Sequence, residues 1–368
     1  MLKPIKMMTE SFAPNLMRDL IKLIKFKITQ LVNNAVRFYW QVMGISPHSN
    51  LLGLTYANDK FTDGAGAQIQ RIYSIYAASR LLQVPYIHSP LTKLNYQGLV
   101  ALEQNTTNQD IVDEYNQIFK ISSDRELPVD YTTEYIKNLD LLTFEKLRRK
   151  ALKSKKFILA KVLLPYKITD TYPETLQCVK DVSPFSLQKS SVIRIAIHVR
   201  RGDLLFVASH RMLSNEYYIS VAQKISAILD QLKLDYVFEL HTELPTQSFT
   251  VTANQHSMLK SDVVVDYKST QLAEFDVIPN LEKFVNADPI ETLQRMSSAN
   301  VLVMSHSSFS YLSAILNVKG VILYHKFWHS PLKNWLITNN VGDFSQEEFI
   351  QQLQKNLAVP EQISSLIE

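Results

Sequence analysis

From about residue 192 onward, short apolar runs alternate with segments of helical periodicity, and this alternation constrains the fold more than any other feature. The strand-like runs are Val192–Val199, Tyr236–His241, Val263–Asp266, Val301–Met304 and Val321–Tyr324. The helix-like segments between them are Asn215–Leu232, Pro289–Ser298 and Ser308–Leu316. Strands that alternate with helices form a parallel sheet covered on both faces. We therefore expect an α/β fold.

The same alternation occurs once nearer the N-terminus. A strand is predicted over Leu51–Tyr56, followed by a glycine loop at 63–68, a helix over Ile69–Leu82 and a strand over Val84–His88. One hydrophobic core rarely serves more than roughly 250–300 residues, and the chain has 368. We expect a domain at 46–188, a second at 189–345 and a C-terminal helix at 346–368.

Residues 1–45 differ from the rest because they are basic and predict one long amphipathic helix. Apolar residues recur at alternating steps of four and three, which places them on one helical face. They are Met17, Ile21, Ile24, Ile28, Leu31, Ala35, Phe38 and Val42. Two interpretations remain open. The helix docks on the protein itself or on a second subunit, or residues 15–43 contact an anionic membrane surface.

Composition limits the class of protein. Hydrophobic residues at 46% and charged residues at 20% are typical of a soluble globular chain. Cys178 is the single cysteine, which excludes an internal disulfide and favours a reducing compartment. There is no signal-peptide pattern and no apolar run near 18 residues. We expect a cytoplasmic protein, with peripheral membrane association as the alternative.

A basic run at 146–156 raises the question of nucleic acid or lipid phosphate. Its expected role is a solvated helix face with local ion pairs. Aromatic residues for base stacking are absent from the run, and the net charge of +4 is small. We therefore expect no nucleic-acid partner.

Glycine indicates where a ligand binds, because the chain contains only eight. Gly64, Gly66 and Gly202 follow predicted strands, where an open α/β sheet binds its ligands. The loop at 64–66 lacks the third glycine of a dinucleotide fingerprint, and no acidic residue follows the next strand. A nicotinamide cofactor is disfavoured.

The segment His198-Val-Arg-Arg-Gly-Asp203 follows a predicted buried strand. Arginines stay charged at physiological pH and can fork onto phosphate oxygens, so Arg200 and Arg201 suit a diphosphate. The alternative is an ion-pair cluster between domains.

Serines crowd the exit of the strand Val301–Met304. Ser305, Ser307, Ser308 and Ser310 precede or begin the next helix. Serine caps and unpaired N–H groups at a helix start form a ready phosphate site. One serine suffices for simple capping, so this cluster favours a ligand.

Together these motifs resemble those of the GDP-fucose-dependent fucosyltransferases, which include α1,2-, α1,6- and protein-O-fucosyltransferases. His198–Asp203 is similar to their H-x-R-R-G/T-D signature. Gly64-Ala-Gly-Ala-Gln68 is similar to their G-x-G-x-Q loop, and Ser307-Ser-Phe-Ser310 to the S-S-F-S of the α1,2 branch. The resemblance implies a GT-B-type fold, in which two Rossmann-like domains face a cleft and the C-terminal one holds most of the donor.

The resemblance also implies residue roles. Arg200 would contact the donor β-phosphate, and His198 would lie beside the guanine or ribose. Thr292 stands where the family has its guanine-selecting acid, so Glu291 or Asp288 is expected to substitute. The full set expected to bind the donor is His198, Arg201, Gly64, Gly66, Gln68, Ser305, Ser307, Ser308, Phe309 and Glu291.

Breaking a sugar–diphosphate bond builds negative charge on the leaving group, which fixed cations and helix N–H groups stabilise. The chain has no Asp-x-Asp motif, so we expect arginine in place of a metal, and no cofactor. Asp203 is the first candidate for the base that accepts the acceptor's proton, ahead of Glu216 and Glu243.

Aromatic residues after the last predicted strand of the sheet also bear on the acceptor. Phe327-Trp-His329 and Trp335 could stack on a sugar face, but a buried aromatic cluster is the favoured interpretation.

The sequence thus predicts an inverting, metal-independent glycosyltransferase that moves fucose from GDP-fucose to a glycan acceptor. Two alternatives remain. One is a glycosyltransferase that uses another nucleotide sugar. The other is a noncatalytic phosphate-ligand or RNA-binding protein on the same scaffold. The oligomeric state is not predicted.

Overall fold

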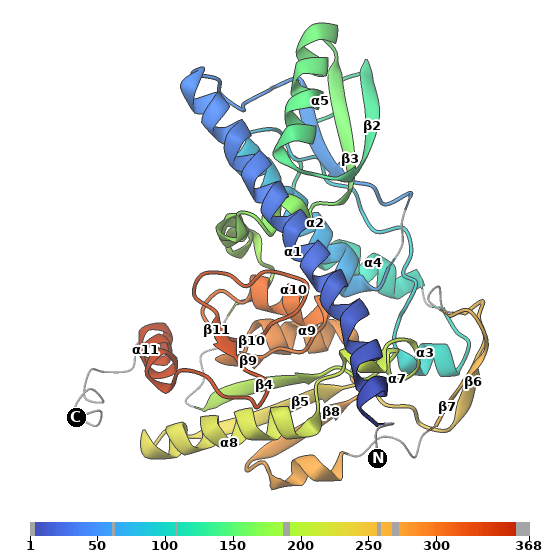
Figure 1. Cartoon of the computed structure of the whole chain (residues 1–368), viewed down its shortest axis with the longest axis vertical. Coiled ribbons are helices and arrows are strands. Elements are labelled where there is room, and N and C mark those ends of the chain that lie inside the picture. Colours follow the sequence, from blue (N-terminus) through green and yellow to red (C-terminus); the bar gives the residue numbers. More distant parts are fainter. Residues whose placement is uncertain are drawn as a thin grey trace.

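The computed structural model describes residues 4–60, 63–107, 109–186, 192–255, 259–266 and 272–357, with backbone alone for 4–16, 18, 19 and 357. Within these ranges the chain forms two parallel sheets connected by helices (Figure 1). The predicted C-terminal helix is observed as α11, Gln346–Leu357, and residues 358–368 lie outside the described part.

The C-terminal unit contains a six-stranded, all-parallel sheet in the order β11-β10-β9-β4-β5-β8. Taken in the direction from β8 to β11, the strands have the spatial order of the Rossmann fold. Its strands are β4 (Ile193–Val199), β5 (Tyr236–Thr242), β8 (Leu281–Val285), β9 (Val301–Val303), β10 (Val321–His325) and β11 (Leu336–Thr338).

Alternate residues of the central strands face opposite cores, as expected for a sheet covered on both sides. Ile195 and Ile197 of β4 pack with α8 (Asn215–Gln231) and α11. Ala196 packs on the other face, with α9 (Pro289–Ser297) and α10 (Ser308–Leu316).

One predicted strand of this sheet is wrong. Residues Val263–Val265 form β7, which pairs antiparallel with β6 (Phe249–Val251) in a separate two-stranded sheet. The edge position belongs instead to β8, none of whose residues is buried. Such a partly solvated edge strand lacks the mostly apolar, buried run by which the central strands were predicted.

The N-terminal unit has a smaller parallel sheet in the order β1-β3-β2. Its strands are β1 (Leu52–Tyr56), β2 (Tyr131–Asn138) and β3 (Phe157–Leu164). The predicted strand Val84–His88 is reduced to a single parallel bridge between Tyr86 and Leu54. The helices and helical turns of this unit are α2 (Ala65–Leu82), α3 (Leu99–Glu103), α4 (Gln109–Ile118), α5 (Leu141–Ser154), α6 (Tyr166–Thr169) and η1 (Pro173–Val182).

The two units face one another across a cleft, and helix α2 of one packs against α10 of the other. A single buried core runs from the N-terminal sheet through α2 to α10 and α9. The GT-B-type fold class expected from the sequence is thus confirmed: two parallel α/β units stand on either side of a cleft (Figure 1).

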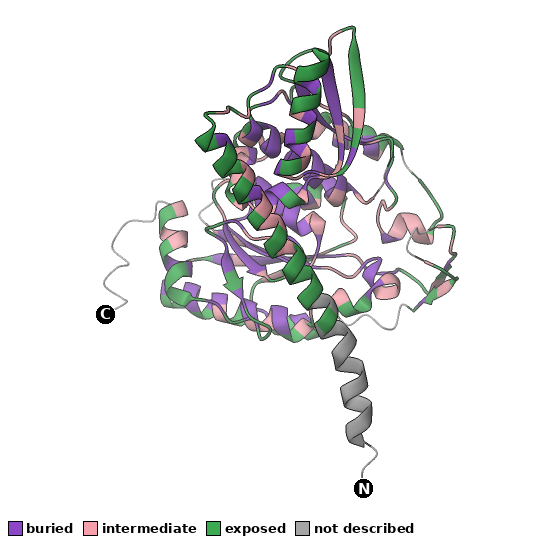
Figure 2. Ribbon diagram, turned by 45° about the horizontal axis from the view of Figure 1, so that its top comes forward, coloured by how far each residue is buried: buried purple, intermediate pink, exposed green. Residues whose placement is uncertain are grey.

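Helix α1 (Pro4–Val42) forms as predicted, but the face that docks is not the apolar stripe. Asn33 is fully buried, where its amide donates to Thr171 Oγ1 at 3.3 Å and accepts from Leu141 N at 3.1 Å. Trp40 Nε1 donates to Glu145 Oε2 at 3.0 Å. The predicted stripe lies exposed on the opposite side (Figure 2). Helix α1 therefore docks on its own chain, as one of the two interpretations held, but it does so through the face of Asn33 and Trp40 and not through the apolar stripe.

No helix in the described part of the chain is both long and apolar enough to cross a membrane.

Candidate functional site

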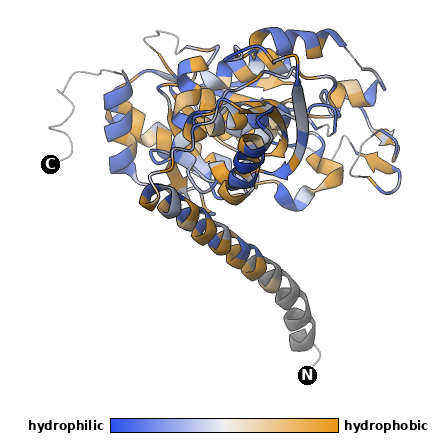
Figure 3. Ribbon diagram, turned by 90° about the horizontal axis from the view of Figure 1, so that it is seen from above, coloured by the Kyte–Doolittle hydropathy of each residue, from blue (hydrophilic) through white to orange (hydrophobic). Residues whose placement is uncertain are grey.

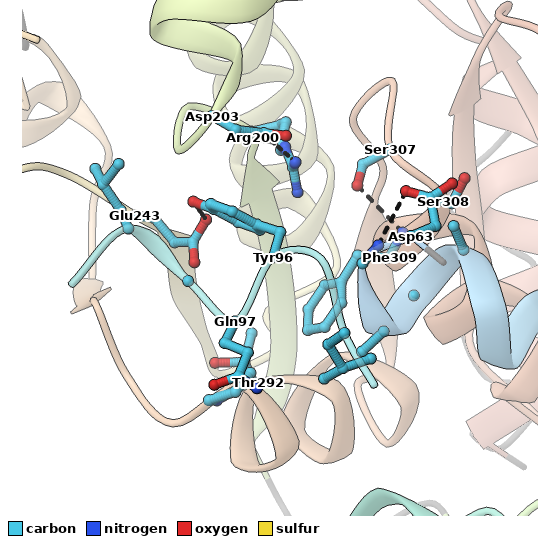
Figure 4. Close-up of a pocket in the computed structure, with 18 of the residues that line it drawn as sticks. Asp63, Tyr96, Gln97, Arg200, Asp203, Glu243, Thr292, Ser307, Ser308 and Phe309 are labelled. Atoms are coloured by element: carbon cyan, nitrogen blue, oxygen red, sulfur yellow. Dashed lines mark hydrogen bonds and ion pairs between the residues drawn. The ribbon is translucent and has the colours of Figure 1, made fainter. Parts of the chain in front are cut away.

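A cavity of about 500 Å³ lies at the carboxyl ends of β4, β5 and β9, with the start of α2 opposite. The strand order reverses between β4 and β9, and open α/β sheets bind ligands at such a switch point. The labelled side chains in Figure 4 come from the exits of these strands, from α9 and from the N-terminal unit.

The start of α10 supplies backbone N–H groups to the cavity wall. Ser307 is the N-cap in an extended conformation, and its Oγ accepts from Phe309 N at 3.2 Å. Ser307, Ser308 and Phe309 all line the cavity, as predicted. Ser308 Oγ lies 3.3 Å from His329 Nε2. The serine cluster therefore shapes a helix start that points its positive end at the cleft.

The start of α2 meets the start of α10 in the same wall. The predicted loop at 64–66 is in fact the beginning of α2, with Gly64 as a cap that lacks a side chain. A Cβ atom on Gly66 would lie 2.5 Å from Phe309 Cα and 2.7 Å from Phe309 N. Only glycine permits this approach. Gly64 and Gly66 line the cavity, so two helix starts face it together.

Arg200 lies at the exit of β4 and lines the cavity, together with Arg71 and Arg211. Its guanidinium pairs with Asp203, and it lies over the Tyr96 ring at 5.8 Å from the centroid. Tyr96 OH donates to Glu243 Oε2 at 2.9 Å, so that Tyr96 joins Arg200 to Glu243 (Figure 4). Gly202 has a φ of +43°, and a Cβ there would collide with the Glu243 carboxylate and the Tyr96 hydroxyl. The glycine of the signature thus makes room for Glu243.

Burial and the neighbouring charges together shift the pKa values of Arg200, Glu243 and Tyr96. Burial opposes the charge of Arg200, but Asp203 and Glu243 raise its pKa above the usual value, so it stays a cation. Burial raises the pKa of the Glu243 carboxyl, although Arg200 opposes the shift. Burial together with Glu243 raises the pKa of Tyr96, so its hydroxyl remains a donor.

His198 lines the cavity as predicted and is neutral. Burial, followed by the charge of Arg200, lowers its pKa well below the usual value. Its Nδ1 lies 2.9 Å from Ser305 Oγ. Ser305 itself is buried behind His198 and does not line the cavity, so its predicted contact with the ligand is replaced by a role in positioning His198.

Gln68 likewise supports the cavity wall from behind. It is fully buried, and its Nε2 donates to the carbonyls of Asp63 at 2.7 Å and Lys93 at 2.9 Å. These bonds hold the loop before α2 against the loop that carries Tyr96. The prediction that Gln68 touches the donor is not met.

Arg201 points away from the cleft, contrary to the prediction for an arginine pair. Successive residues of extended chain face opposite sides, and the Arg201 guanidinium bonds to Asn215 Oδ1. It lines a second hollow with Glu216 and Glu274. Arg200 is therefore the arginine of the signature that faces the cavity, and Glu216 lines the second hollow and not the cavity.

Glu291 also lies outside the cavity, contrary to prediction. Its exposed carboxylate lies 3.6 Å from Arg295 Nη1, whereas its neighbour Thr292 lines the cavity. Asp288 lines the cavity too, but its carboxylate caps α9 by accepting from Ile290 N and Glu291 N.

The aromatic residues after β10 divide between core and cavity. His329 and Trp335 are buried and Phe327 packs against them, which confirms the aromatic-core interpretation for these three. Trp328 is 45% exposed and lines the cavity, and the Arg211 guanidinium lies 4.1 Å from the centre of one of its rings.

Sequence reasoning found Gly64 and Gly66 but missed the rest of the wall that comes from the N-terminal unit. Tyr96, Gln97 and Gly98 lie in a loop that crosses the cleft beside Arg200. Asp63 accepts from Arg71 Nη2 at 2.7 Å in the same wall. The loop has no motif around it. Two features could have identified this loop as part of the site. Gly98 is one of few glycines in the chain and adopts a φ of +114°, and the loop follows the bridge residue Tyr86.

In the described part of the chain, no three His, Cys, Asp or Glu side chains gather in a way that could hold a metal ion.

No protein-family model and no curated protein matches the chain. Among solved structures, it is similar to an arginine-to-lysine variant of Arabidopsis thaliana FUT1 in complex with GDP, at 12% identity and a TM-score of 0.36, over 75% of this chain and 71% of that one. It is similar to E. coli heptosyltransferase WaaC with ADP-2-deoxy-2-fluoro heptose, at 8% identity and a TM-score of 0.38, over 83% and 99%. It is similar to POFUT1 in complex with GDP, at 10% identity and a TM-score of 0.34, over 73% and 95%. These similarities are weak, so the proposal below rests on the residues of the cleft.

Proposed function

We propose that the protein is an inverting glycosyltransferase that takes fucose from GDP-fucose and passes it to a glycan acceptor. The observation that carries this proposal is the convergence of Arg200 and the starts of α2 and α10 on one cavity at the switch point of a Rossmann-type sheet. The leaving group of such a reaction is a nucleoside diphosphate, and this combination of fixed positive charges suits its phosphates.

The diphosphate would bind between Arg200 and the backbone N–H groups at the start of α10. As the bond from the sugar carbon to the phosphate oxygen breaks, the electron pair stays on the oxygen, and these donors stabilise its charge. Asp203 pairs with Arg200 and thereby fixes the direction in which the guanidinium points. Since arginine and helix starts supply the positive charge, the proposal needs no metal ion or other cofactor.

Inversion requires a base that accepts the proton of the attacking acceptor hydroxyl. Asp203, the first candidate from sequence, is engaged by Arg200. Glu243 lines the same corner, and burial raises the pKa of its carboxyl toward the range useful for a base. We therefore propose Glu243 as the base and assign Asp203 the positioning of Arg200.

One observation favours another nucleotide sugar as a second candidate donor. A guanine-selecting acid is expected at the position of Thr292, and the nearby Glu291 carboxylate lies outside the cavity. Base selection therefore has to be measured. Isothermal titration with GDP, UDP and ADP tests it, because tight binding confined to GDP supports GDP-fucose and equal binding of all three contradicts it.

The test of the catalytic proposal uses the two neighbouring arginines as a matched pair. Arg200→Ala should abolish binding of nucleoside diphosphate and release of GDP from GDP-fucose. Arg200→Lys should also fail, because an ammonium group cannot reproduce the planar fork of a guanidinium. Arg201→Ala should leave both measurements close to wild type, since Arg201 faces the second hollow. Equal damage by Arg200→Ala and Arg201→Ala would contradict the assignment.

A noncatalytic phosphate- or RNA-binding role makes a different prediction. The wild-type protein would then bind RNA in a salt-sensitive way and release no GDP from GDP-fucose. Acceptor transfer itself is measured with a panel of glycans, and metal independence by repeating the assay in EDTA.

A further inference from the structure

We infer that the exposed face of α1, continued by the neighbouring face of α5, binds the surface of a membrane that contains anionic phospholipid. This inference is independent of the proposed reaction, because neither face contributes to the cleft.

The first observation is a long apolar stripe that the protein itself leaves uncovered. Its large described residues are between 44% and 69% exposed. They are Met17, Ile21, Ile24, Ile28, Leu31, Phe38 and Val42. The stripe faces away from the buried residues Asn33 and Trp40, by which α1 docks. At 1.5 Å per residue it extends for roughly 40 Å. Orange residues run along the whole described part of α1 in Figure 3.

The second observation is the charge that flanks the stripe. Lys25 and Lys27 are exposed on either side of the stripe, and the sequence has no Asp or Glu from 20 to 43. A helix with an apolar face and cationic flanks lies in the plane of a membrane, with its apolar side chains among the acyl chains and its lysines at the phosphates.

The third observation joins α5 to this surface. Arg149 of α5 lies over the Tyr39 ring at 5.7 Å and donates to its hydroxyl at 3.4 Å, so the two helices meet there. Leu142, Lys146 and Lys153 are exposed and share the face of α5 that carries Arg149, by their spacing of four, three and four. Part of the basic run is engaged locally, as expected, because Lys150 pairs with Glu134 and Lys156 with Asp130.

A second copy of the chain would cover the stripe less well than a lipid surface. Two α1 stripes packed together would bring the lysines of one helix near those of the other, and residues 20–43 offer no carboxylate to neutralise them. Phosphates of anionic lipid supply that negative charge along the entire stripe. Charge complementarity therefore favours the membrane.

The test is flotation of the full-length protein with vesicles. One set contains phosphatidylcholine alone, and the other equal parts of phosphatidylcholine and phosphatidylglycerol. We expect binding to the anionic vesicles that falls with salt. Lys25→Gln with Lys27→Gln should lower the partition coefficient about 25-fold, because each lysine near an anionic surface contributes a factor of about five.

Ile24→Asp with Ile28→Asp should abolish binding without unfolding the protein, since both side chains are exposed. The matched control is Val341→Asp, which changes an exposed aliphatic residue elsewhere to the same acid and should bind like wild type. Titration of these variants with nucleoside diphosphate reports on the cleft separately, so failure of one proposal is distinct from failure of the other.

Three results would overturn the inference. The first is the absence of wild-type protein from the anionic vesicle fraction. The second is equal binding to both vesicle types with no effect of the lysine changes. The third is a wild-type dimer by light scattering that Ile24→Asp with Ile28→Asp converts to a monomer, because a second copy would then cover the stripe.

Discussion

The close contact of Gly66 with Phe309, between the two units, predicts a large effect of one added methyl group on GDP binding. In Gly66→Ala, the new Cβ would lie 2.5 Å from Phe309 Cα, 2.7 Å from Phe309 N and 2.9 Å from Phe309 Cβ. Carbon atoms in ordinary contact lie about 3.5–4.0 Å apart. The starts of α2 and α10 must therefore separate by about 1 Å, since neither backbone atom of Phe309 can rotate away.

A shift of this size matters for a ligand held by backbone N–H groups. A hydrogen bond from a backbone N–H at the start of α10 to a phosphate oxygen, normally about 2.7–3.2 Å long, would be stretched beyond useful geometry. A hydrogen bond to a charged group contributes about 1.5–3 kcal/mol, so GDP affinity should fall roughly 10- to 150-fold. The crowding should also lower the free energy of unfolding by about 1–3 kcal/mol.

Isothermal titration with GDP, with thermal melts to confirm folding, measures both effects. The control is Gly64→Ala, two residues earlier on the same helix start. A Cβ on Gly64 would meet only Tyr96, at 3.9 Å, and its φ of −66° suits alanine. A folded Gly66→Ala protein that binds GDP like wild type would refute the role assigned to this helix contact. So would equal damage from Gly64→Ala.

Three further predictions address neighbouring features. Gly202→Ala should lower GDP release from GDP-fucose, measured by a coupled assay, because it forces an unfavourable φ and displaces Glu243. Asn33→Ala should lower the free energy of unfolding in urea by about 1–3 kcal/mol, because Leu141 N loses its buried acceptor. Burial raises the pKa of Asp170 to about 7, so the folded protein favours the protonated form and wild-type stability declines as pH rises from about 4 to 7. The stabilisation by Asp170→Asn should therefore grow by about 1.4 kcal/mol per pH unit over that range and level off above it, in urea titrations at several pH values.

The strands of the Rossmann-type sheet were predictable because most of them are buried on both faces. Val301–Val303 is wholly apolar and Ile193–Val199 is apolar except for Arg194 and His198, and each strand leads into its motif. The edge strand Leu281–Val285 carries charge on its solvated side and has no such apolar run. Local sequence thus predicts central strands better than edge strands.

The docking of α1 was not predictable, although the helix itself was. Its most regular apolar positions are exposed, and its buried face is built on an asparagine and a tryptophan that hydrogen-bond to α5 and its neighbourhood. The apolar periodicity identified a surface, and we infer above that lipid covers it. The side that packs on the protein was set by polar partners more than 100 residues away in the chain.

The candidate site shows the same division between local and long-range information. The signature at 198–203 predicted the cation Arg200, and chain alternation explains why Arg201 faces the other way. The carboxylate that completes the corner comes from another strand. Val199 pairs with Thr242 in the register of β4 and β5, so the residues that follow them, Arg200 and Glu243, leave the sheet side by side. The motif favours Asp203 as the base because Asp203 is the carboxylate nearest to Arg200 in the sequence. Strand register depends on the whole sheet, and it favours Glu243 because it brings Glu243 beside Arg200. The pH dependence of GDP-fucose turnover distinguishes them: Glu243→Gln should remove the rise of activity with pH that reports deprotonation of the base, whereas Asp203→Asn should weaken nucleotide binding and keep that rise.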